Sequence, residues 1–315
     1  MALLPWAHSS AVAQHLALAQ TIVLPEVQGR LDHIAIDLDG GRLFVAALAA
    51  GSVEVLDLHA GVRTSRIEHL REPQGVSYLA ASRRLFIAEG KGQRVVVFAN
   101  SAQLAVVSGL EDADNMRLEP GDGRLFVGYG NALAAIDAGT MHVINRVSLA
   151  GHPEAFELAA SGPQIFVNVP SAGHVAVVDR STGKVTATWG VSTVGQNFAM
   201  ALDERGHRLF VATRRPAMLL AFDTTSGSHV ASIRICDDAD DLFFDQERRQ
   251  LYAVCGEGAV DVIQAQGADH FKVVEHFQTS LGARTGLFVP QLATLFVAAP
   301  ARGGLPAEIR AYAVR

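Results

Sequence analysis

The stretch Arg42-Leu43-Phe44-Val45-Ala46 decides the fold, because close relatives of it return six more times along the chain. The copies begin at residues 42, 84, 124, 164, 208, 250 and 294, and the steps between their aliphatic second residues are 42, 40, 40, 44, 42 and 44 residues. A period near 40, built from short β-branched and aromatic runs, is typical of a β-propeller with one four-stranded blade per period. Seven copies therefore predict an all-β protein, a seven-bladed β-propeller.

Each period predicts an inner strand a, the marker strand b, a third strand c and an outer strand d. In the first blade, strand a begins at His33, strand b at Arg42, and strand c covers 53–58. The later a-strands are expected near 75–79, 115–118, 155–158, 199–202, 241–244 and 285–288. The chain ends with a c-strand at 308–314, whereas 15–24 is a lone outer strand. We expect this N-terminal strand to complete the last blade and close the ring, which removes open sheet edges.

Four of the c-strands end in an aspartate that is followed closely by a glycine. The aspartates are Asp57, Asp137, Asp179 and Asp223, and the glycines are Gly61, Gly139, Gly183 and Gly227. This pattern is typical of hairpins that need a residue at positive φ. We therefore interpret these aspartates as turn formers and not as catalytic residues.

Composition narrows the class of protein and its partners. The 315 residues are 49% hydrophobic and 18% charged, which predicts a soluble protein with a large core. A net charge of −6 gives no basis for a nucleic-acid partner. No apolar run reaches the ~18 residues that a membrane span requires. We expect a monomer, with residues 1–14 as a leader or N-terminal extension and residues 15–315 as one propeller domain.

Two local features bear on the cellular compartment. Ala11-Val12-Ala13 resembles a signal-peptide cleavage site, although no Lys or Arg precedes it and His8-Ser9-Ser10 interrupts the apolar run. A periplasmic or secreted location is predicted, with a cytoplasmic one as the alternative. The two cysteines, Cys236 and Cys255, are interpreted as free buried thiols, with a disulfide or a shared ligand role as alternatives.

The repeated strand resembles that of a known family. The RLFVA copies look like the RLYVTN-type strand of the YVTN-repeat β-propellers, and His33-Ile34-Ala35-Ile36-Asp37 resembles the GIAVDP segment of the same family. The resemblance covers residues 15–315 and implies a bacterial-type propeller. Because that family includes surface-layer, binding and enzymatic proteins, the resemblance favours no single activity. At the end of strand b only Asn168 keeps the asparagine of the family.

The repeat also supplies an internal control for functional residues. A residue that builds a blade should recur at the equivalent position of every repeat, whereas a residue of a functional site need occur in only one repeat. We count back from the aliphatic second residue of each strand b, which we call the marker. The residues eleven and ten positions before it begin strand a, and they are Asp32-His33, Gln74-Gly75, Asp114-Asn115, Glu154-Ala155, Phe198-Ala199 (after Asn197), Asp240-Asp241 and Arg284-Thr285. These positions should surround the mouth of the central channel. The b–c loops on the same face add Glu89, Tyr129, Asn168, Arg214 and Glu257.

The chemistry of this predicted funnel points to a small ligand or a cation. Carboxylates brought together repel one another and raise each other's pKa, so such a cluster usually holds a cation, a proton or an arginine. Oxygen donors suit Ca²⁺, Mg²⁺ or Mn²⁺, and His33 can recruit Zn²⁺. Arg214 and Arg284 can clamp an anionic group of a small-molecule ligand. The predicted cofactor is one such divalent cation, with no cofactor as the alternative.

Candidate roles follow from residue type. The catalytic candidates are His33, Glu154, Asp241 and Arg284. The ligand-binding candidates are Asp32, Gln74, Asp114, Tyr129, Asn168, Arg214 and Glu257. The metal-ligand candidates are Asn115, Glu154, Asn197 and Asp241, a set that looks like the Glu/Asn/Asn/Asp ligands of the six-bladed gluconolactonase-like propellers.

Three functions remain open at this point. The first is a protein that binds a small ligand or divalent cation at the channel mouth. The second is a metal-assisted propeller enzyme, a lactonase-like hydrolase or a lyase, in which the ion polarises a carbonyl or stabilises an enolate. The third is a scaffold for protein interactions. A hydrated channel without a ligand is the remaining alternative. The chain shows no Ser-His-Asp order, P-loop or HExxH motif.

Overall fold

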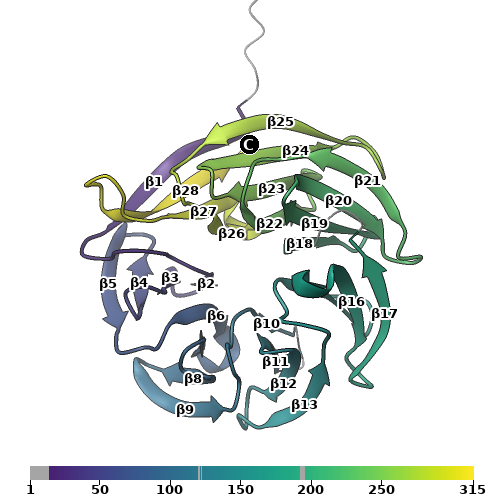
Figure 1. The fold of residues 1–315 in the computed structure, drawn as a ribbon. Helices are drawn as coiled ribbons and strands as arrows, with labels where there is room; N and C mark the ends of the chain where they lie inside the picture. The colour runs from purple at the N-terminus through teal and green to yellow at the C-terminus, as the bar shows by residue number, and fades with distance from the viewer. Residues whose placement is uncertain (1–13, 120, 122, 192–195) are drawn as a thin grey trace, which may run out of the picture.

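The computed structural model describes residues 14–315 except 120, 122 and 192–195, and it is a ring of seven four-stranded antiparallel sheets (Figure 1). Each sheet is one blade, and the first strand of most blades lies nearest the axis. This confirms the all-β, seven-bladed propeller that the repeat predicts. Of the segment interpreted as a leader or extension, residues 1–13 lie outside the described residues.

The first four blades follow the chain from inside to outside. Blade 1 comprises β2 (Ile34–Asp37), β3 (Arg42–Ala47), β4 (Ser52–Asp57) and β5 (Val62–Ile67). Blade 2 comprises β6 (Pro73–Leu79), β7 (Arg84–Glu89), β8 (Arg94–Ala99) and β9 (Ala102–Ser108). Blade 3 comprises β10 (Met116–Leu118), β11 (Arg124–Tyr129), β12 (Ala132–Asp137) and β13 (Val143–Ser148). Blade 4 comprises β14 (Phe156–Leu158), β15 (Gln164–Val169), β16 (His174–Asp179) and β17 (Lys184–Gly190).

The last three blades complete the ring. Blade 5 comprises β18 (Asn197–Asp203), β19 (Arg208–Arg214), β20 (Ala217–Asp223) and β21 (His229–Arg234). Blade 6 comprises β22 (Ala239–Asp245), β23 (Gln250–Cys255), β24 (Ala259–Ala265) and β25 (Phe271–Gln278). Blade 7 comprises β26 (Thr285–Val289), β27 (Thr294–Ala299), β28 (Ala307–Val314) and β1 (Leu16–Leu24). Short 3₁₀ turns occupy Ala80–Ser82, Pro170–Ala172 and Pro290–Leu292.

The ring closes through the N-terminal strand, as the lone outer strand predicted. In Figure 1, β1 lies beside β28, although the two strands come from opposite ends of the chain. Their antiparallel register runs from Leu16 opposite Val314 to Leu24 opposite Ala307. Next to the first of these pairs, the backbone N–H of Arg315 donates to the carbonyl of His15 at 2.9 Å. Blade 7 is therefore built from both ends of the described chain.

The marker strands supply the core between blades, because both faces of each b-strand are buried. The seven marker aromatics are only 0–4% exposed: Phe44, Phe86, Phe126, Phe166, Phe210, Tyr252 and Phe296. The core divides into seven hydrophobic clusters, one at each blade–blade interface. Phe44 packs with Leu85 of blade 2, while its neighbour Leu43 packs with Phe296 of blade 7. The alternation of side chains along the strand thus joins each blade to both neighbours.

The aspartates at the ends of the c-strands form turns, as predicted. Asp57 Oδ1 accepts the backbone N–H groups of His59 and Ala60, both at 2.8 Å. Asp137, Asp179 and Asp223 accept equivalent pairs of N–H groups in their own turns. Gly61, Gly183 and Gly227 adopt positive φ at the fourth residue after the aspartate. In blade 3 the fourth residue after Asp137 is Met141, and it is Met141 that adopts positive φ. The prediction for Gly139, which is only two residues after the aspartate, is therefore wrong.

Cys236 and Cys255 form a disulfide, which corrects the interpretation as free thiols. Cys236 lies in the loop that enters blade 6, and Cys255 ends β23, next to the innermost strand of that blade. Their Cα atoms are 5.9 Å apart, within the range that a disulfide spans. The bond ties the entry loop of blade 6 to its second strand.

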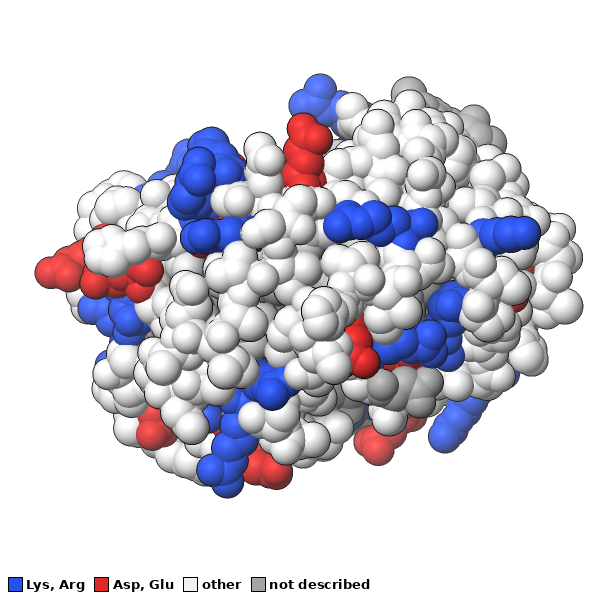
Figure 2. Space-filling model, turned by 90° about the horizontal axis from the view of Figure 1, so that it is seen from below, with Lys and Arg blue, Asp and Glu red and all other residues white. Residues whose placement is uncertain are grey.

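The outer surface carries charges of both signs. Figure 2 shows the ring edge-on, with Lys and Arg interspersed among Asp and Glu and no broad field of one sign on this side. This agrees with the small net charge of −6. In the part of the chain that the structure describes, no helix has the length and apolarity needed to cross a membrane.

Candidate functional site

The residues that begin the inner strands are presented by the same backbone pattern in different blades. The N–H of Asp32 donates to the carbonyl of Ala46 at 2.8 Å, and the N–H of Glu154 donates to that of Asn168 at 3.0 Å. Asp114 makes the equivalent bond to Gly128 at 3.0 Å. This equivalent position carries aspartate in three blades and Gln, Glu, Phe or Arg in the other four. We call this set, together with two neighbouring arginines, the mouth ring: Asp32, Gln74, Asp114, Glu154, Phe198, Asp240, Arg284, Arg30 and Arg214.

One side of the mouth ring is an interlocked set of arginines and aspartates. Arg214 is ion-paired with Asp240 and lies 3.2 Å from Asp238 through Nε. Arg284 reaches the same two aspartates, at 3.1 Å from Asp240 Oδ2 and 3.0 Å from Asp238 Oδ2. The Arg214 guanidinium also stacks on Phe198, 3.7 Å from the ring centroid. These two arginines already have anionic partners within the protein.

The other side of the mouth ring is acidic and poorly satisfied. Asp32 is fully buried (0% exposed), and Arg30 Nη2 lies 3.0 Å from its Oδ2. Despite that ion pair, neither carboxylate oxygen of Asp32 accepts a hydrogen bond from any described residue. His33 Nε2 lies 3.8 Å from Asp32 Oδ1 and 3.7 Å from Asp114 Oδ1, both too long for hydrogen bonds. A buried carboxylate without hydrogen bonds is costly unless a cation or a proton compensates it.

Burial and mutual repulsion raise the pKa values of the carboxyl groups on this side. Burial raises the pKa of Glu154 to about 8, and the charges of Asp114 and Asp240 add to the effect. Burial also raises the pKa of Asp114 to about 6, although His152 and Arg30 oppose it. The pKa of Asp32 lies well above its ordinary value, chiefly because of burial. Carboxyl groups with raised pKa values stay protonated to a higher pH than usual, and a nearby cation stabilises their ionised forms.

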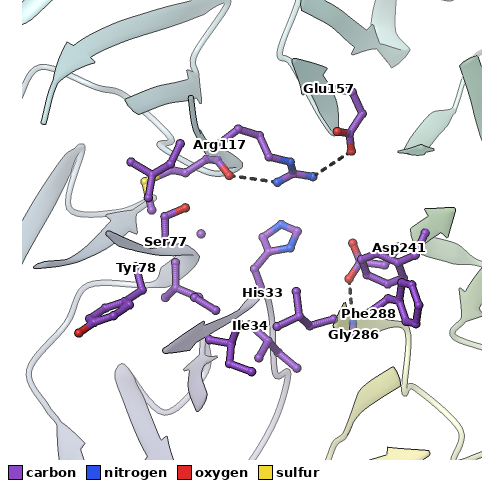
Figure 3. Close-up of a pocket in the computed structure, with 17 residues that line it drawn as sticks. His33, Ile34, Ser77, Tyr78, Arg117, Glu157, Asp241, Gly286 and Phe288 are labelled. Carbon is purple, nitrogen blue, oxygen red and sulfur yellow. Dashed lines mark hydrogen bonds and ion pairs between the residues drawn. The ribbon is translucent and has the colours of Figure 1, made fainter. Parts of the chain in front are cut away.

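A cavity of about 340 Å³ lies in the channel below the mouth ring (Figure 3). The His33 imidazole projects into it between Arg117 and Asp241. Burial lowers the pKa of His33 to about 3, with the positive charges of Arg117 and Arg30 contributing, so the ring is neutral at physiological pH. Asp241 Oδ2 accepts the N–H of Gly286 at 2.8 Å, and burial raises the pKa of this carboxyl to about 7.

Three polar residues of the cavity were missed by the sequence analysis: Ser77, Arg117 and Glu157. They occupy one repeat position, eight residues before the marker, where the other blades have Ala35, Ala201, Phe243 and Leu287. The signal was therefore present. Side chains two apart in a strand share a side, so the internal control applied at positions 32–33 also applied two residues further along strand a.

Several predicted site residues instead join blades to one another. Asn197 Nδ2 donates to Asn168 Oδ1 at 2.9 Å, and Asn168 Nδ2 donates to the Phe198 carbonyl at 3.0 Å. These amides bridge blades 4 and 5. Tyr129 accepts a hydrogen bond from Arg146 of the outer strand β13 at 2.7 Å, so its hydroxyl faces outward.

Three further predicted residues have partners outside the mouth ring. Gln74 donates to Asp112 at 3.3 Å. The carboxylate of Glu257 accepts the N–H of Asp237 at 2.9 Å and lies 3.6 Å from His276. Glu89 is fully buried, ion-paired with Arg94, and accepts the N–H of Arg71 at 2.8 Å. In the part of the mouth described here, the structure brings together Asp32, His33, Asp114, Arg214, Asp240 and Arg284.

Two of the four predicted metal ligands bind other residues of the protein. Asn197 uses its amide to bind Asn168, and Asp241 binds Gly286. The amide oxygens of Asn115 and Asn197 are buried without hydrogen-bond partners among the described residues. Those residues contain no group of three or more His, Cys, Asp or Glu placed to hold a metal ion. Asn115, Glu154, Asn197 and Asp241 as ligands of one metal ion therefore stay a prediction.

Comparison with known proteins supports the propeller fold and indicates no activity. No family model matches the sequence, and no curated protein matches it. Among solved structures, a chain titled Kuenenia stuttgartiensis Hydrazine Synthase superposes with a TM-score of 0.73 at 15% identity. The match covers 87% of this chain and 95% of that chain. At such low identity the likeness shows the propeller fold alone.

Proposed function

We propose that this propeller is a binding protein whose channel mouth holds a small cation, at the side formed by Asp32, Asp114 and Glu154. The observation that carries the proposal is the Asp32 carboxylate, which is fully buried and accepts no hydrogen bond from the described residues. Arg30 supplies one positive charge, 3.0 Å from Asp32 Oδ2, and a second positively charged group would compensate the remaining carboxyl groups of this side. It would also stabilise the ionised forms of Asp114 and Glu154, whose pKa values are raised to about 6 and about 8.

The other side of the mouth ring supports a cation in preference to an anion. Arg214 and Arg284 both contact Asp238 and Asp240, so an anionic ligand would compete with two carboxylates already in place. Arg30 lies between the two sides, 3.0 Å from Asp32 and 3.6 Å from Asp240. The recognised group is an ammonium in preference to a divalent ion, because ammonium groups interact with clustered carboxylates, whereas the described residues hold no group of three His, Cys, Asp or Glu placed to bind a metal ion.

Glu154→Gln is expected to raise the free energy of unfolding at pH 8 by about 1–3 kcal/mol, because each unit of pKa shift corresponds to about 1.4 kcal/mol. The pKa of Glu154 is raised to about 8 in the folded protein from an ordinary 4.5. Between these values the folded state binds a proton that the unfolded state releases, so its contribution to stability falls as pH rises. Between pH 5 and pH 8 the free energy of unfolding should therefore fall less in the variant than in the wild type, as measured by urea unfolding. The exposed Asp39→Asn is the control.

The same variant tests cation binding. Ca²⁺, Mg²⁺, Mn²⁺, Zn²⁺, methylammonium and tetramethylammonium are titrated against the protein at pH 8, with the melting temperature and calorimetric heat as readouts. At least one should stabilise the wild type and Asp39→Asn, and stabilise Glu154→Gln much less. The proposal fails if none of these cations binds, or if the one that binds does so equally well to Glu154→Gln.

The disulfide supports a location in an oxidising compartment, either the periplasm or the exterior of the cell. Buried disulfides such as Cys236–Cys255 persist there and are rare in the cytosol. Protein isolated from its natural cells without reductant should show no thiol that alkylates after denaturation, and two after reduction. Two alkylated thiols before reduction would place the protein in a reducing compartment.

We also propose kinship with the YVTN-repeat propellers, supported by the seven marker strands.

A further inference from the structure

The cavity below the mouth ring has a polar end and an apolar end. Its polar end carries Arg117, His33 and Ser77, all of which Figure 3 shows around the channel. Its walls continue along the inner strands with Ile36, Leu118 and Phe288. At about 340 Å³ it has the size of a small-molecule pocket. We call this cavity the chamber.

Arg117 is the feature of the chamber that needs a partner. Among the described residues its guanidinium donates one hydrogen bond, from Nη1 to the carbonyl of Met116 at 3.0 Å. Nη2 lies 3.8 Å from Glu157 Oε1, beyond hydrogen-bond distance. Figure 3 shows the guanidinium reaching across the channel above His33, and the side chain is 34% exposed. Most of its N–H groups therefore have no acceptor within the described chain.

The surroundings leave this charge only partly neutralised. Two carboxyl groups of the chamber interact with Arg117, those of Glu157 and Asp241, and burial raises the pKa of both, which reduces the negative charge that faces the arginine. The neutral His33 ring has one N–H to donate, and Ser77 adds a hydroxyl on the same side of the chamber. An arginine fork, an imidazole N–H and a hydroxyl are the donors that a carboxylate needs.

We propose that the chamber binds a small monocarboxylate with an aliphatic or aromatic body. The carboxylate pairs with Arg117 and accepts from His33, and the body lies against Leu118, Ile36 and Phe288. Apolar walls disfavour inorganic anions, which would lose hydration without gaining contacts. This site uses a different charged residue from the cation site proposed at the mouth, and His33 stands between the two, with Nε2 3.8 Å from Asp32 Oδ1 and 3.7 Å from Asp114 Oδ1.

Benzoate and hexanoate are the probes, and benzamide is the neutral counterpart of benzoate. Isothermal titration at pH 7.5 should show binding of benzoate or hexanoate, and binding of benzamide at least tenfold weaker. Arg117→Gln should weaken carboxylate binding at least tenfold. Arg117→Lys should retain part of it, because the charge remains while the two-pronged geometry is lost. The exposed Arg205→Gln is the matched control and should bind as the wild type does.

Glu157→Gln provides a second test that does not depend on losing function. Removing the carboxylate that competes for Arg117 should strengthen benzoate binding about threefold to tenfold. Melting curves confirm that each variant is folded before titration. The proposal is overturned if neither carboxylate binds at 10 mM, as a rough limit for a specific site. It is also overturned if benzamide binds as well as benzoate, if Arg117→Gln binds as the wild type does, or if Glu157→Gln weakens binding.

Discussion

A chain that begins at Pro25, and so lacks β1, is expected to lose the folded monomer. β1 supplies the fourth strand of blade 7, and its Leu16, Ile22 and Leu24 side chains are 0–1% exposed. Burying each such side chain contributes about 1.5–3 kcal/mol. Their sum, together with the lost strand pairing, is comparable with the ~5–15 kcal/mol that holds a whole domain folded. The exposed edge of β28 would then pair with other chains.

The measurement compares this variant with one that begins at Gln14, by light scattering after size exclusion and by thermal unfolding. The shorter chain should be aggregated, oligomeric or unfolded. A synthetic peptide of residues 14–26 should restore a cooperative transition if the missing strand is the sole cause. On the intact chain, Ile22→Asp should destabilise strongly and Val23→Asp little, because Ile22 is 1% and Val23 is 44% exposed. A monomeric, cooperatively melting chain from Pro25 would contradict the closure assigned here.

The second large effect is expected for Phe210→Ala, which should lower the free energy of unfolding by about 3–5 kcal/mol through lost burial and a residual cavity. Phe210 packs between blades 5 and 6, 5.5 Å from the Phe244 ring and 5.2 Å, edge-on, from the Phe271 ring. Urea unfolding measures the change. Val62→Ala on the outer strand β5 is the control and should stay within about 0.5 kcal/mol, because Val62 is half exposed.

Phe86→Ala tests whether the effect belongs to the repeat position, since Phe86 is equally buried between blades 2 and 3. Similar losses in both variants would show that the blade interfaces carry the stability of the ring. Wild-type unfolding curves for both variants would mean that the marker aromatics are not the contacts that hold neighbouring blades together.

The candidate site was only partly predictable, and the reason differs from residue to residue. Asp32, Asp114 and Glu154 were found because the repeat identifies equivalent positions, and a ring brings equivalent positions together. Asn168 and Tyr129 stand in b–c loops on the predicted face, yet Asn168 bonds to the backbone of blade 5 and Tyr129 to Arg146. The direction of a loop side chain depends on its neighbours in space, and a single sequence does not list them. Arg117 and Glu157 stand at a repeat position that is apolar in four of the seven blades, so a functional role there is less evident than at the polar start of strand a.

The number of blades, the order of their strands and the closure by residues 16–24 all follow from a local periodicity that the sequence repeats seven times. Tertiary structure alone decided which charges neutralise one another. Arg214 and Arg284 meet Asp238 and Asp240 across three blades, while the oxygens of Asp32 accept no hydrogen bond from the described residues. It also decided that Cys236 and Cys255 join. Electrostatic pairing and disulfide formation depend on distances of a few ångströms between residues remote in the chain, which the order of residues along one strand does not contain.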